Sequence, residues 1–458
     1  MGKKFDFEYI VIGSGPAGMT AALNLARLTD KKIAIVEGGV LGGALSARDI
    51  PSAASLKFAH TYYKATHSAD CGISGMSLHF NFPTAVNHQE DLTRNAVFDA
   101  HEKLEKAGVT CILGMANFID ENTIAIGERE YSSRYFIIAT GASLNTANIT
   151  GVDYVNYLTP ETALKNRRLP QAVCVVGGGA TGCEIAEYFA KLGVKTALLE
   201  RSSRLLPRED EEVGKVMREY FENELGVIVL TNARVVAIEK DNVSKRVVFA
   251  KDGHEKMVRV DTIVLATGSE PAVDLGLENA NVKYKKNGIL TNSFFQTTAK
   301  NIFAIGDCIG GESSTDLATK QGGFLASSLA YRAKMPFDAT GAIRVVSTCP
   351  GVAVVGYNED DLIRRDKHYR KELVHLSETS IMKSLCKTKG FVKLIANREN
   401  RLIGAVIVAP NAVLLAHELA LAVRSRVSLG ELATMPHAVM SFGEAVQIAA
   451  RRMMTRKK

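Results

Sequence analysis

Cysteine is scarce in this sequence, and the few cysteines are widely spaced. The seven residues stand at positions 71, 111, 174, 183, 308, 349 and 386, with no CxxC motif and no paired spacing. Structural zinc sites and the disulfide frameworks of small secreted proteins both need closely spaced cysteines. The pattern argues against both classes. It predicts reduced, mostly buried thiols and no metal site.

The chain also lacks a long uninterrupted apolar segment and a strong excess of one charge. The most apolar run, Leu402 to Val423, contains Pro410, Asn411, His417 and Glu418, which favours a strand followed by a helix over a membrane span. The net charge is +7, but charges of both signs alternate along most of the chain, so we expect no nucleic-acid partner. A glycine turn interrupts the apolar N-terminal run, which argues against a signal peptide and favours a cytoplasmic protein.

A dinucleotide-binding βαβ unit is predicted between Tyr9 and Glu37. An apolar strand runs into the turn GSGPAG, an Ala/Leu-rich helix follows, and a second apolar strand ends on an acid. The first glycine permits the tight turn, the second lets a pyrophosphate approach the N–H groups of the helix, and the third allows the helix to pack on the strand. The acid would accept ribose hydroxyls. The residues expected to contact the nucleotide are Gly13, Gly15, Pro16, Ala17, Gly18 and Glu37.

The same pattern occurs a second time, from Ala172 to Glu200. The acid follows the first glycine of the turn by 24 residues in the first copy (13 to 37) and by 23 in the second (177 to 200). Each copy is later followed by an apolar strand that ends in ATG. Two dinucleotide domains in tandem predict two bound dinucleotides with electrons passing between them. The residues expected at the second site and in the ATG turns are Gly177, Gly179, Thr181, Gly182, Glu184, Glu200, Arg201, Ala139, Thr140, Gly141, Ala266, Thr267 and Gly268.

The remaining chain contains one further strand with an acid at its end and a C-terminal region of different composition. The segment from Lys300 to Asp307 is predicted as a strand that delivers an acid at its carboxyl end, where α/β sheets bind ligands. The ordinary alternative for Asp307 is a cap on the next helix. From about Gly341, alternating β segments and a helix predict a separate α+β unit.

Taken together, these motifs resemble the class I pyridine nucleotide-disulfide oxidoreductases, which include dihydrolipoamide dehydrogenase, mercuric reductase and the soluble transhydrogenase. The motifs are GSGPAG with Glu37, both ATG turns, GGGATGCE, FAIGDC and STCPGVAVVGYNED, and they span nearly the whole chain. The resemblance implies an α/β fold with two tandem Rossmann-like domains and a C-terminal α+β dimerisation domain. Residues 1–150 and 271–340 would form the FAD-binding domain, and residues 151–270 the NAD(P)-binding domain. Residues 341–458 would form the dimerisation domain of a homodimer.

The resemblance also implies roles for individual residues. The first turn and Glu37 would hold the adenosine half of FAD, Asp307 its ribityl chain, and Glu184 would lie beside the nicotinamide. Glu200 favours NADH because an acid at that strand end repels a 2′-phosphate. Arg201 and Arg204 could instead bind that phosphate, which would admit NADPH, or they could be two solvated surface arginines. Further cofactor contacts are expected from Gly42, Gly43, Gly306 and Ala318.

The sequence departs from the family where the chemistry is expected. The family's redox disulfide lies in a run resembling GGTCxNxGCIPSK, and here Leu45 and Asp49 occupy roughly the two cysteine positions. Ala53 replaces the lysine of that run. In the family's HPTxxE run the acid remains as Glu444, but the general-base histidine is replaced by Val439.

His437 and the isolated cysteines are the candidates for rescuing disulfide chemistry. We interpret His437 as a structural histidine and Cys71 and Cys349 as inert core thiols, with Cys183 and Cys308 in packing roles. The interpretation that Lys57 replaces the missing lysine partner of Glu184 is a further hypothesis.

The sequence therefore predicts an FAD-dependent NAD(P)H oxidoreductase that delivers electrons directly to a non-disulfide acceptor. The acceptor would be a quinone, oxygen, a nicotinamide nucleotide or a redox protein. Candidate catalytic residues are Glu184, Glu444, Asp49 and Arg48. Two alternatives remain: a dihydrolipoamide dehydrogenase-like or mercuric reductase that uses other cysteines, and a non-catalytic flavoprotein that senses NAD(H).

Overall fold

Segments far apart in the sequence form two units in the computed structural model. The first unit contains Met1–Ala54, Pro83–Asn145 and Gly268–Asp338, and the second contains Ser55–Phe82, Thr146–Thr267 and Ala339–Lys458. The structure describes residues 4–69, 78–146, 149–241, 244–311, 314–333, 335–384 and 389–455. The predicted division of the chain into FAD, NAD(P) and dimerisation domains stays a prediction.

The first unit is built on a seven-stranded sheet in the order β3-β2-β1-β6-β5-β4, with β18 beside β6. Strand β1 is parallel to both β2 and β6, and β18 is parallel to β6. The predicted βαβ unit is therefore present, and the FIIATG strand lies next to it. The bounds are β1 Phe7–Ile12, β2 Ile33–Glu37, β3 Thr110–Leu113, β4 Ala116–Asp120, β5 Thr123–Ile126, β6 Arg129–Ile138 and β18 Ile302–Ala304.

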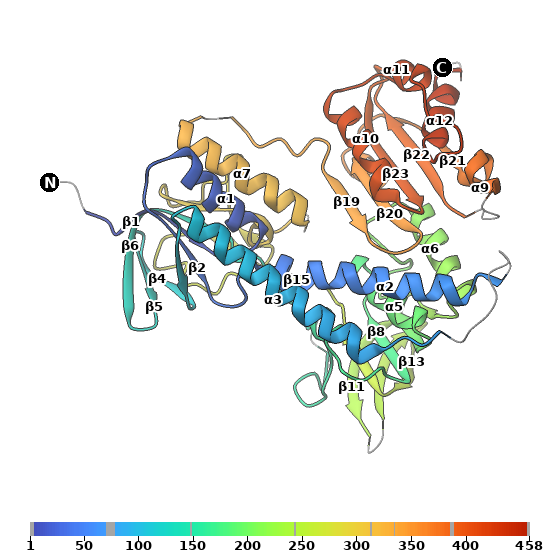
Figure 1. The fold of residues 1–458 in the computed structure, drawn as a ribbon, viewed down its shortest axis with the longest axis horizontal. Helices are drawn as coiled ribbons and strands as arrows, with labels where there is room; N and C mark the ends of the chain where they lie inside the picture. Colours follow the sequence, from blue (N-terminus) through green and yellow to red (C-terminus); the bar gives the residue numbers. More distant parts are fainter. Residues whose placement is uncertain are drawn as a thin grey trace. The chain divides into compact units, whose positions relative to one another are not determined.

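Helices α1 (Pro16–Leu28) and α7 (Thr315–Tyr331) lie side by side in this unit (Figure 1). Gly322 permits the close approach, because a Cβ there would lie 2.2 Å from the carbonyl oxygen of Ala17. Helix α3 spans Phe82–Lys106 and so begins before Glu90. The turn before Glu90 is polar in sequence, but Val86 is fully buried there, so packing extends the helix.

The second unit contains a parallel sheet in the order β10-β9-β8-β14. Beside it lies an antiparallel sheet in which β12 and β13 form a hairpin. Asp252 and Gly253 have φ values of +53° and +77°, as a two-residue hairpin turn requires. The bounds are β8 Ala172–Val176, α5 Ala180–Lys191, β9 Lys195–Leu199, α6 Glu211–Asn223, β10 Ile228–Leu230, β11 Arg234–Lys240, β12 Lys245–Lys251, β13 His254–Val260 and β14 Thr262–Leu265.

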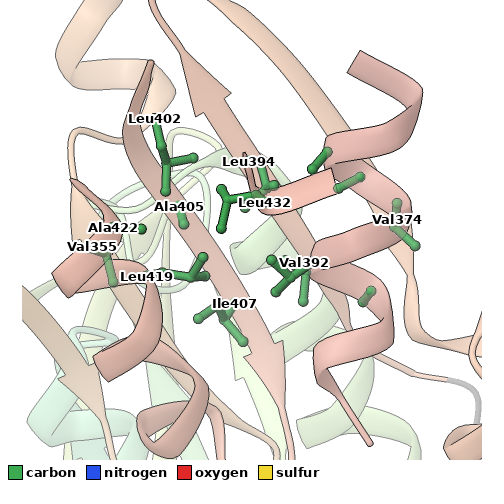
Figure 2. Packing of buried hydrophobic residues seen from close by; sticks show 14 of the residues in the cluster. Val355, Val374, Val392, Leu394, Leu402, Ala405, Ile407, Leu419, Ala422 and Leu432 are labelled. Carbon is green, nitrogen blue, oxygen red and sulfur yellow. The ribbon is translucent and has the colours of Figure 1, made fainter. Parts of the chain in front are cut away.

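The C-terminal part of this unit is a five-stranded antiparallel sheet in the order β19-β20-β23-β22-β21. Helices α10 and α12 cover one face, and Figure 2 shows Leu394, Ile407 and Leu419 in the core between sheet and helices. The predicted strand-then-helix at Leu402 to Val423 is confirmed as β23 and α10, and none of the described helices is long and apolar enough to cross a membrane. The bounds are β19 Ile343–Val346, β20 Gly351–Gly356, α8 Glu359–Arg364, β21 Arg370–His375, β22 Phe391–Ala396, β23 Leu402–Ala409, α10 Ala412–Arg424, α11 Leu429–Thr434 and α12 Gly443–Thr455.

Candidate functional site

The first glycine turn has two crowded positions and one open position. Gly13 has φ +103°, and a Cβ there would lie 2.3 Å from the carbonyl oxygen of Ala139. A Cβ on Gly18 would lie 1.9 Å from the carbonyl oxygen of Gly13. At Gly15 a Cβ would meet no atom within 4 Å, so the backbone there faces open space. The turn therefore fits a pyrophosphate at Gly15.

The second turn repeats this geometry in the other unit. Gly177 has φ +112°, and its Cβ would lie 2.2 Å from the carbonyl oxygen of Ala266. A Cβ on Gly182 would lie 1.8 Å from the carbonyl oxygen of Gly177, whereas Gly179 faces open space. Each turn thus packs against the alanine of its own ATG motif. Both turns suit a dinucleotide for the same reason, namely an open backbone at the middle glycine between two crowded glycines.

The acid at the end of each second strand holds its own glycine turn. Glu37 Oε2 accepts hydrogen bonds from the Ser14 backbone N–H at 2.8 Å and from Ser14 Oγ at 2.6 Å. Glu200 Oε2 accepts the Gly178 N–H at 2.7 Å, and its Oε1 accepts the Ser202 N–H at 2.7 Å. The predicted ribose acceptors are therefore also oriented by the turns they serve.

Asp307 lies at the end of β18, in the short helix Gly306–Ile309. The Gly306 N–H donates to Gln321 Oε1 at 2.7 Å, and a Cβ on Gly306 would lie 3.3 Å from the Ala17 Cβ. These contacts place the acid next to the first turn. Helix α7 is capped by Ser314, so the alternative of Asp307 as its cap is wrong.

The segment that corresponds to the family's redox disulfide, and that lacks both cysteines here, contains a π-helix, Leu45–Asp49. Arg48 Nε donates to Asp49 Oδ1 at 2.9 Å, and Thr315 Oγ1 donates to Asp49 Oδ2 at 2.7 Å. Both carboxylate oxygens of Asp49 are thus held by neighbours in the same unit. Helix α2 (Ile50–Thr66) follows directly.

Glu184 lies near the N-terminus of α5, and its predicted place beside the nicotinamide stays a prediction. Its Oε1 accepts the backbone N–H of Ser347 at 2.6 Å. Lys57 is exposed on α2, and its proposed role as the partner of Glu184 stays a hypothesis. The link from Glu184 to Ser347 was missed by sequence reasoning because the two residues lie 163 positions apart.

The C-terminal candidates are occupied by contacts within their own domain. His437 Nε2 lies 3.0 Å from Glu418 Oε1, and Nδ1 lies 3.1 Å from the Met435 carbonyl oxygen. Both ring nitrogens are therefore engaged, which favours the structural interpretation. Glu444 accepts backbone N–H groups of Met440 at 2.6 Å and Ser380 at 2.8 Å. Val439 is 79% exposed.

The cysteines fall into two groups. Cys174, Cys183 and Cys308 are fully buried, and burial raises the pKa of Cys174 and of Cys308 to about 12 and that of Cys183 well above its ordinary value. These thiols stay protonated and serve packing. The prediction of an isolated core thiol at Cys349 is wrong, because the residue is only partly buried and its sulfur lies 3.4 Å from His60 Nε2. Residues 71 and 386 lie outside the described residues.

Of the two arginines that follow Glu200, one is already bound. Arg204 forms an ion pair with Asp360 and donates to the Glu209 carbonyl oxygen at 3.0 Å. Arg201 is exposed. The geometry therefore leaves one arginine, not two, at the surface beside the ribose acceptor.

Comparison with known proteins identifies the family. Residues 7–322 match the pyridine nucleotide-disulphide oxidoreductase family, and residues 343–450 match the dimerisation domain of the same family. The chain belongs to this family. Members are FAD-dependent NAD(P)H oxidoreductases, and FAD and NAD(H) fit the two domains.

Relatives resemble the chain over nearly its full length. A mercuric reductase of Staphylococcus aureus is 29% identical over 97% of this chain and 82% of its own. A dihydrolipoyl dehydrogenase of the same organism is 30% identical over 98% of this chain and 96% of its own. The crystal structure of LpdA from Mycobacterium tuberculosis aligns with a TM-score of 0.87 at 26% identity, covering 98% of this chain and 100% of LpdA.

A second solved structure supports the fold alone. The HOCl-induced flavoprotein disulfide reductase RclA of Escherichia coli aligns with a TM-score of 0.85 at 22% identity, covering 97% of this chain and 99% of RclA.

Proposed function

We propose that this protein oxidises NADH with FAD as its redox group and delivers the electrons to an acceptor without a protein disulfide in between. The observation that carries the proposal is the segment Leu45–Asp49, where an apolar residue and an ion-paired carboxylate occupy the positions that the resemblance assigns to two cysteines. Thiol–disulfide exchange needs a thiolate and a base that manages its proton. Neither Leu45 nor Asp49 supplies a sulfur atom.

The residues of the chain bind and orient the cofactors in this scheme. When bound, FAD takes a hydride from NADH and passes electrons on, which is chemistry of the cofactor and not of a side chain. Gly15 and Gly179, whose backbone is open, would bind the two pyrophosphates, and Glu37 and Glu200, each held by hydrogen bonds to its own turn, would bind the riboses. Glu184 would lie at the nicotinamide.

NADH is favoured over NADPH by the contacts around Glu200. This acid is 5% exposed and has both oxygens aimed at backbone N–H groups, so a 2′-phosphate beside it would meet a fixed negative charge. Arg204, which sequence reasoning offered as a phosphate ligand, is paired with Asp360. Kinetics with both nucleotides test this preference.

Arg48 and Asp49 are proposed to line the acceptor site. Their side chains are 37% and 25% exposed, so both are within reach of a small molecule. Substituting Arg48 by Met should slow turnover with the acceptor while leaving NADH oxidation by the flavin in a single turnover unchanged. A change in both steps would place Arg48 elsewhere in the reaction.

Two further features belong to the proposal. The match of residues 343–450 to the family's dimerisation domain supports a homodimer, which sedimentation tests. The scattered cysteine pattern supports a reducing compartment such as the cytoplasm.

Anaerobic stopped-flow mixing with NADH tests the central claim. Flavin absorbance should bleach without the long-wavelength band of a thiolate–flavin charge-transfer complex. A thiol titration of the denatured protein before and after NADH should give the same count, since a disulfide enzyme gains two thiols on reduction.

Appearance of the band, or a gain of two thiols, would establish the disulfide reductase that the names of the curated relatives favour. Absence of bleaching with either nucleotide would support a sensing flavoprotein instead. After bleaching, a screen of quinones, oxygen, nicotinamide nucleotides and redox proteins would identify the acceptor.

A further inference from the structure

Three elements of the second unit form a chain of polar contacts that ends at the thiol of Cys349. The residue lies in the loop between β19 and β20, and its sulfur is 3.4 Å from Nε2 of His60 on α2. His60 Nδ1 lies 3.1 Å from Nζ of Lys191 on α5. Lys191 Nζ lies in turn 2.8 Å from Glu187 Oε1, one turn earlier on the same helix. We call Cys349, His60, Lys191 and Glu187 the thiol array.

The hydrogen bonds of the array have a fixed direction. A lysine ammonium only donates, so Nδ1 of His60 is the acceptor in its contact with Lys191. A neutral imidazole then carries its proton on Nε2, which faces the sulfur. The sulfur of Cys349 is therefore the acceptor of an N–H hydrogen bond. Such a bond stabilises a thiolate relative to a thiol.

Lys191 forms a buried ion pair with Glu187. Its side chain is 1% exposed and that of Glu187 2%, and at this depth the two charges compensate each other. Glu187 Oε1 also accepts the Tyr220 hydroxyl at 2.8 Å and the Cys349 backbone N–H at 2.7 Å. Burial, together with Glu187, raises the pKa of Tyr220, so this hydroxyl remains a donor.

Exposure separates Cys349 and Cys111 from the other described thiols. Three of them are fully buried, whereas Cys349 and Cys111 are partly exposed. Cys111 shows no imidazole contact among the described hydrogen bonds, and burial raises the pKa of its thiol. Cys349 thus combines access for a small reagent with a donor aimed at its sulfur.

We propose that Cys349 is a reactive thiol that undergoes exchange with low-molecular-weight disulfides. Its thiolate attacks one sulfur of the disulfide, a bond forms between that sulfur and Cys349 Sγ, and the original S–S bond breaks. The other half leaves as a thiolate that takes a proton from water. One disulfide bond, that of the reagent, is replaced by one mixed disulfide at Cys349, and attack by a free thiol on the mixed disulfide reverses the step.

The position of the array links this exchange to the nucleotide site. Ser347, two residues before Cys349, donates its backbone N–H to Glu184 Oε1 at 2.6 Å, and Glu187 of the array lies one helical turn from Glu184. A group attached at the half-buried sulfur needs space and displaces the loop that holds Glu184. This second part rests on the proposed function, since it assumes that Glu184 faces the nicotinamide.

The test is the rate of mixed-disulfide formation with 2,2′-dipyridyl disulfide, assigned to individual cysteines by peptide mass spectrometry. At pH 7 Cys349 should react roughly 3- to 10-fold faster than Cys111, because an ordinary thiol is only a few per cent ionised there and nucleophilicity offsets part of the gain. Its rate should change little between about pH 6.5 and 9. A rate that rises with pH as for an ordinary thiol would overturn the proposal, and this measurement needs no variant.

Two variants at one position test the role of the imidazole. His60→Leu removes the donor and should lower the Cys349 rate at pH 7 by a similar factor, with little effect at pH 10, where any thiol is ionised. His60→Gln keeps an N–H group near the place of Nε2 and should retain much of the rate. Equal rates in wild type and His60→Leu at pH 7 would refute the array.

A separate readout distinguishes this site from the proposed function. The protein carrying the mixed disulfide at Cys349 should be bleached by NADH several-fold more slowly than the same sample after treatment with dithiothreitol. Unchanged bleaching would remove the link to Glu184 and leave the reactive thiol standing. Failure of the untreated protein to bleach would refute the proposed function without touching the labelling result.

Discussion

A fully buried lysine offers the sharpest test of how the second unit is held together. Lys393 lies in β22 with its side chain 0% exposed, and its Nζ contacts Asp210 at 2.6 Å, Glu212 at 2.9 Å and Glu359 at 3.2 Å. The carboxylates come from α6, the residue before it, and α8. One ammonium group therefore joins the C-terminal sheet to the nucleotide-binding part of the same unit.

Lys393→Met keeps most of the apolar stem but leaves three carboxylates without this cation. Asp210 is 2% exposed, so its charge would remain buried next to two others. Breaking a buried pair by removing one partner typically costs about 3–5 kcal/mol. For a domain of this size that corresponds to a Tm lower by roughly 6–20 °C.

The matched control is Lys371→Met. Lys371 also contacts Glu359, at 2.5 Å, but its side chain is 45% exposed, so its loss should cost about 0–1 kcal/mol. Thermal unfolding followed by circular dichroism compares the two variants. A drop in Tm for Lys393→Met as small as that for Lys371→Met would refute the reasoning.

The same cluster predicts a pH dependence. Burial opposes ionisation of Glu212 and Glu359, but hydrogen bonds and the charge of Lys393 outweigh it and lower the pKa of both carboxyls. Their contribution to stability is therefore present above the unfolded pKa, near 4.3, and is lost as pH falls through the lowered folded values. The Tm difference between wild type and Lys393→Met should be full at pH 7 and shrink below about pH 4; a constant difference would contradict this.

Five further substitutions separate folding from binding. Gly179→Ala should weaken NADH binding without changing Tm, because its Cβ would meet open space in the folded protein. Gly182→Ala should lower Tm, because its Cβ would lie 1.8 Å from a backbone oxygen. Equal effects of the two variants on Tm would contradict the assignment. Gly43→Ala should reduce FAD retention after purification, since its Cβ would lie 2.7 Å from Gly15 Cα. Leu45→Ala should retain FAD, because Leu45 is 39% exposed. His437→Gln should lower stability by about 1 kcal/mol and leave the NADH bleaching rate unchanged; a slower rate would make His437 part of the reaction.

The glycine turns could be predicted from sequence because every contact that defines them is local or repeats at a fixed spacing. Gly13 and Gly18 are five positions apart, and their crowding follows from the strand–turn–helix order. The ends of helices are harder to predict from sequence than the glycine turns. The start of α3 depends on the burial of Val86, which a polar stretch of sequence does not reveal.

The clusters of charged and reactive residues could not be predicted for the opposite reason. His60 lies 131 positions from Lys191 and 289 from Cys349, so no spacing rule connects them. In sequence Lys393 is one lysine within an apolar strand. Sequence reasoning consequently placed Cys349 in the core and did not single out Lys393, because both roles arise from which helices pack on the loop and the sheet.

The segment after the first turn keeps the two glycines of the family's disulfide run, Gly42 and Gly43, but not its two cysteines. A Cβ on Gly43 would press on Gly15, and the Gly42 N–H donates to Ser14 Oγ at 2.9 Å, the same hydroxyl that donates to Glu37. Gly42 and Gly43 are thus part of the nucleotide turn, whatever chemistry follows them. Leu45 is 39% exposed and makes no such contact with the turn among the described hydrogen bonds. Within this short segment, the residues that shape the nucleotide turn differ from the residues at the two positions where the family carries its cysteines. The route by which electrons leave the flavin can therefore differ while the FAD turn keeps its geometry.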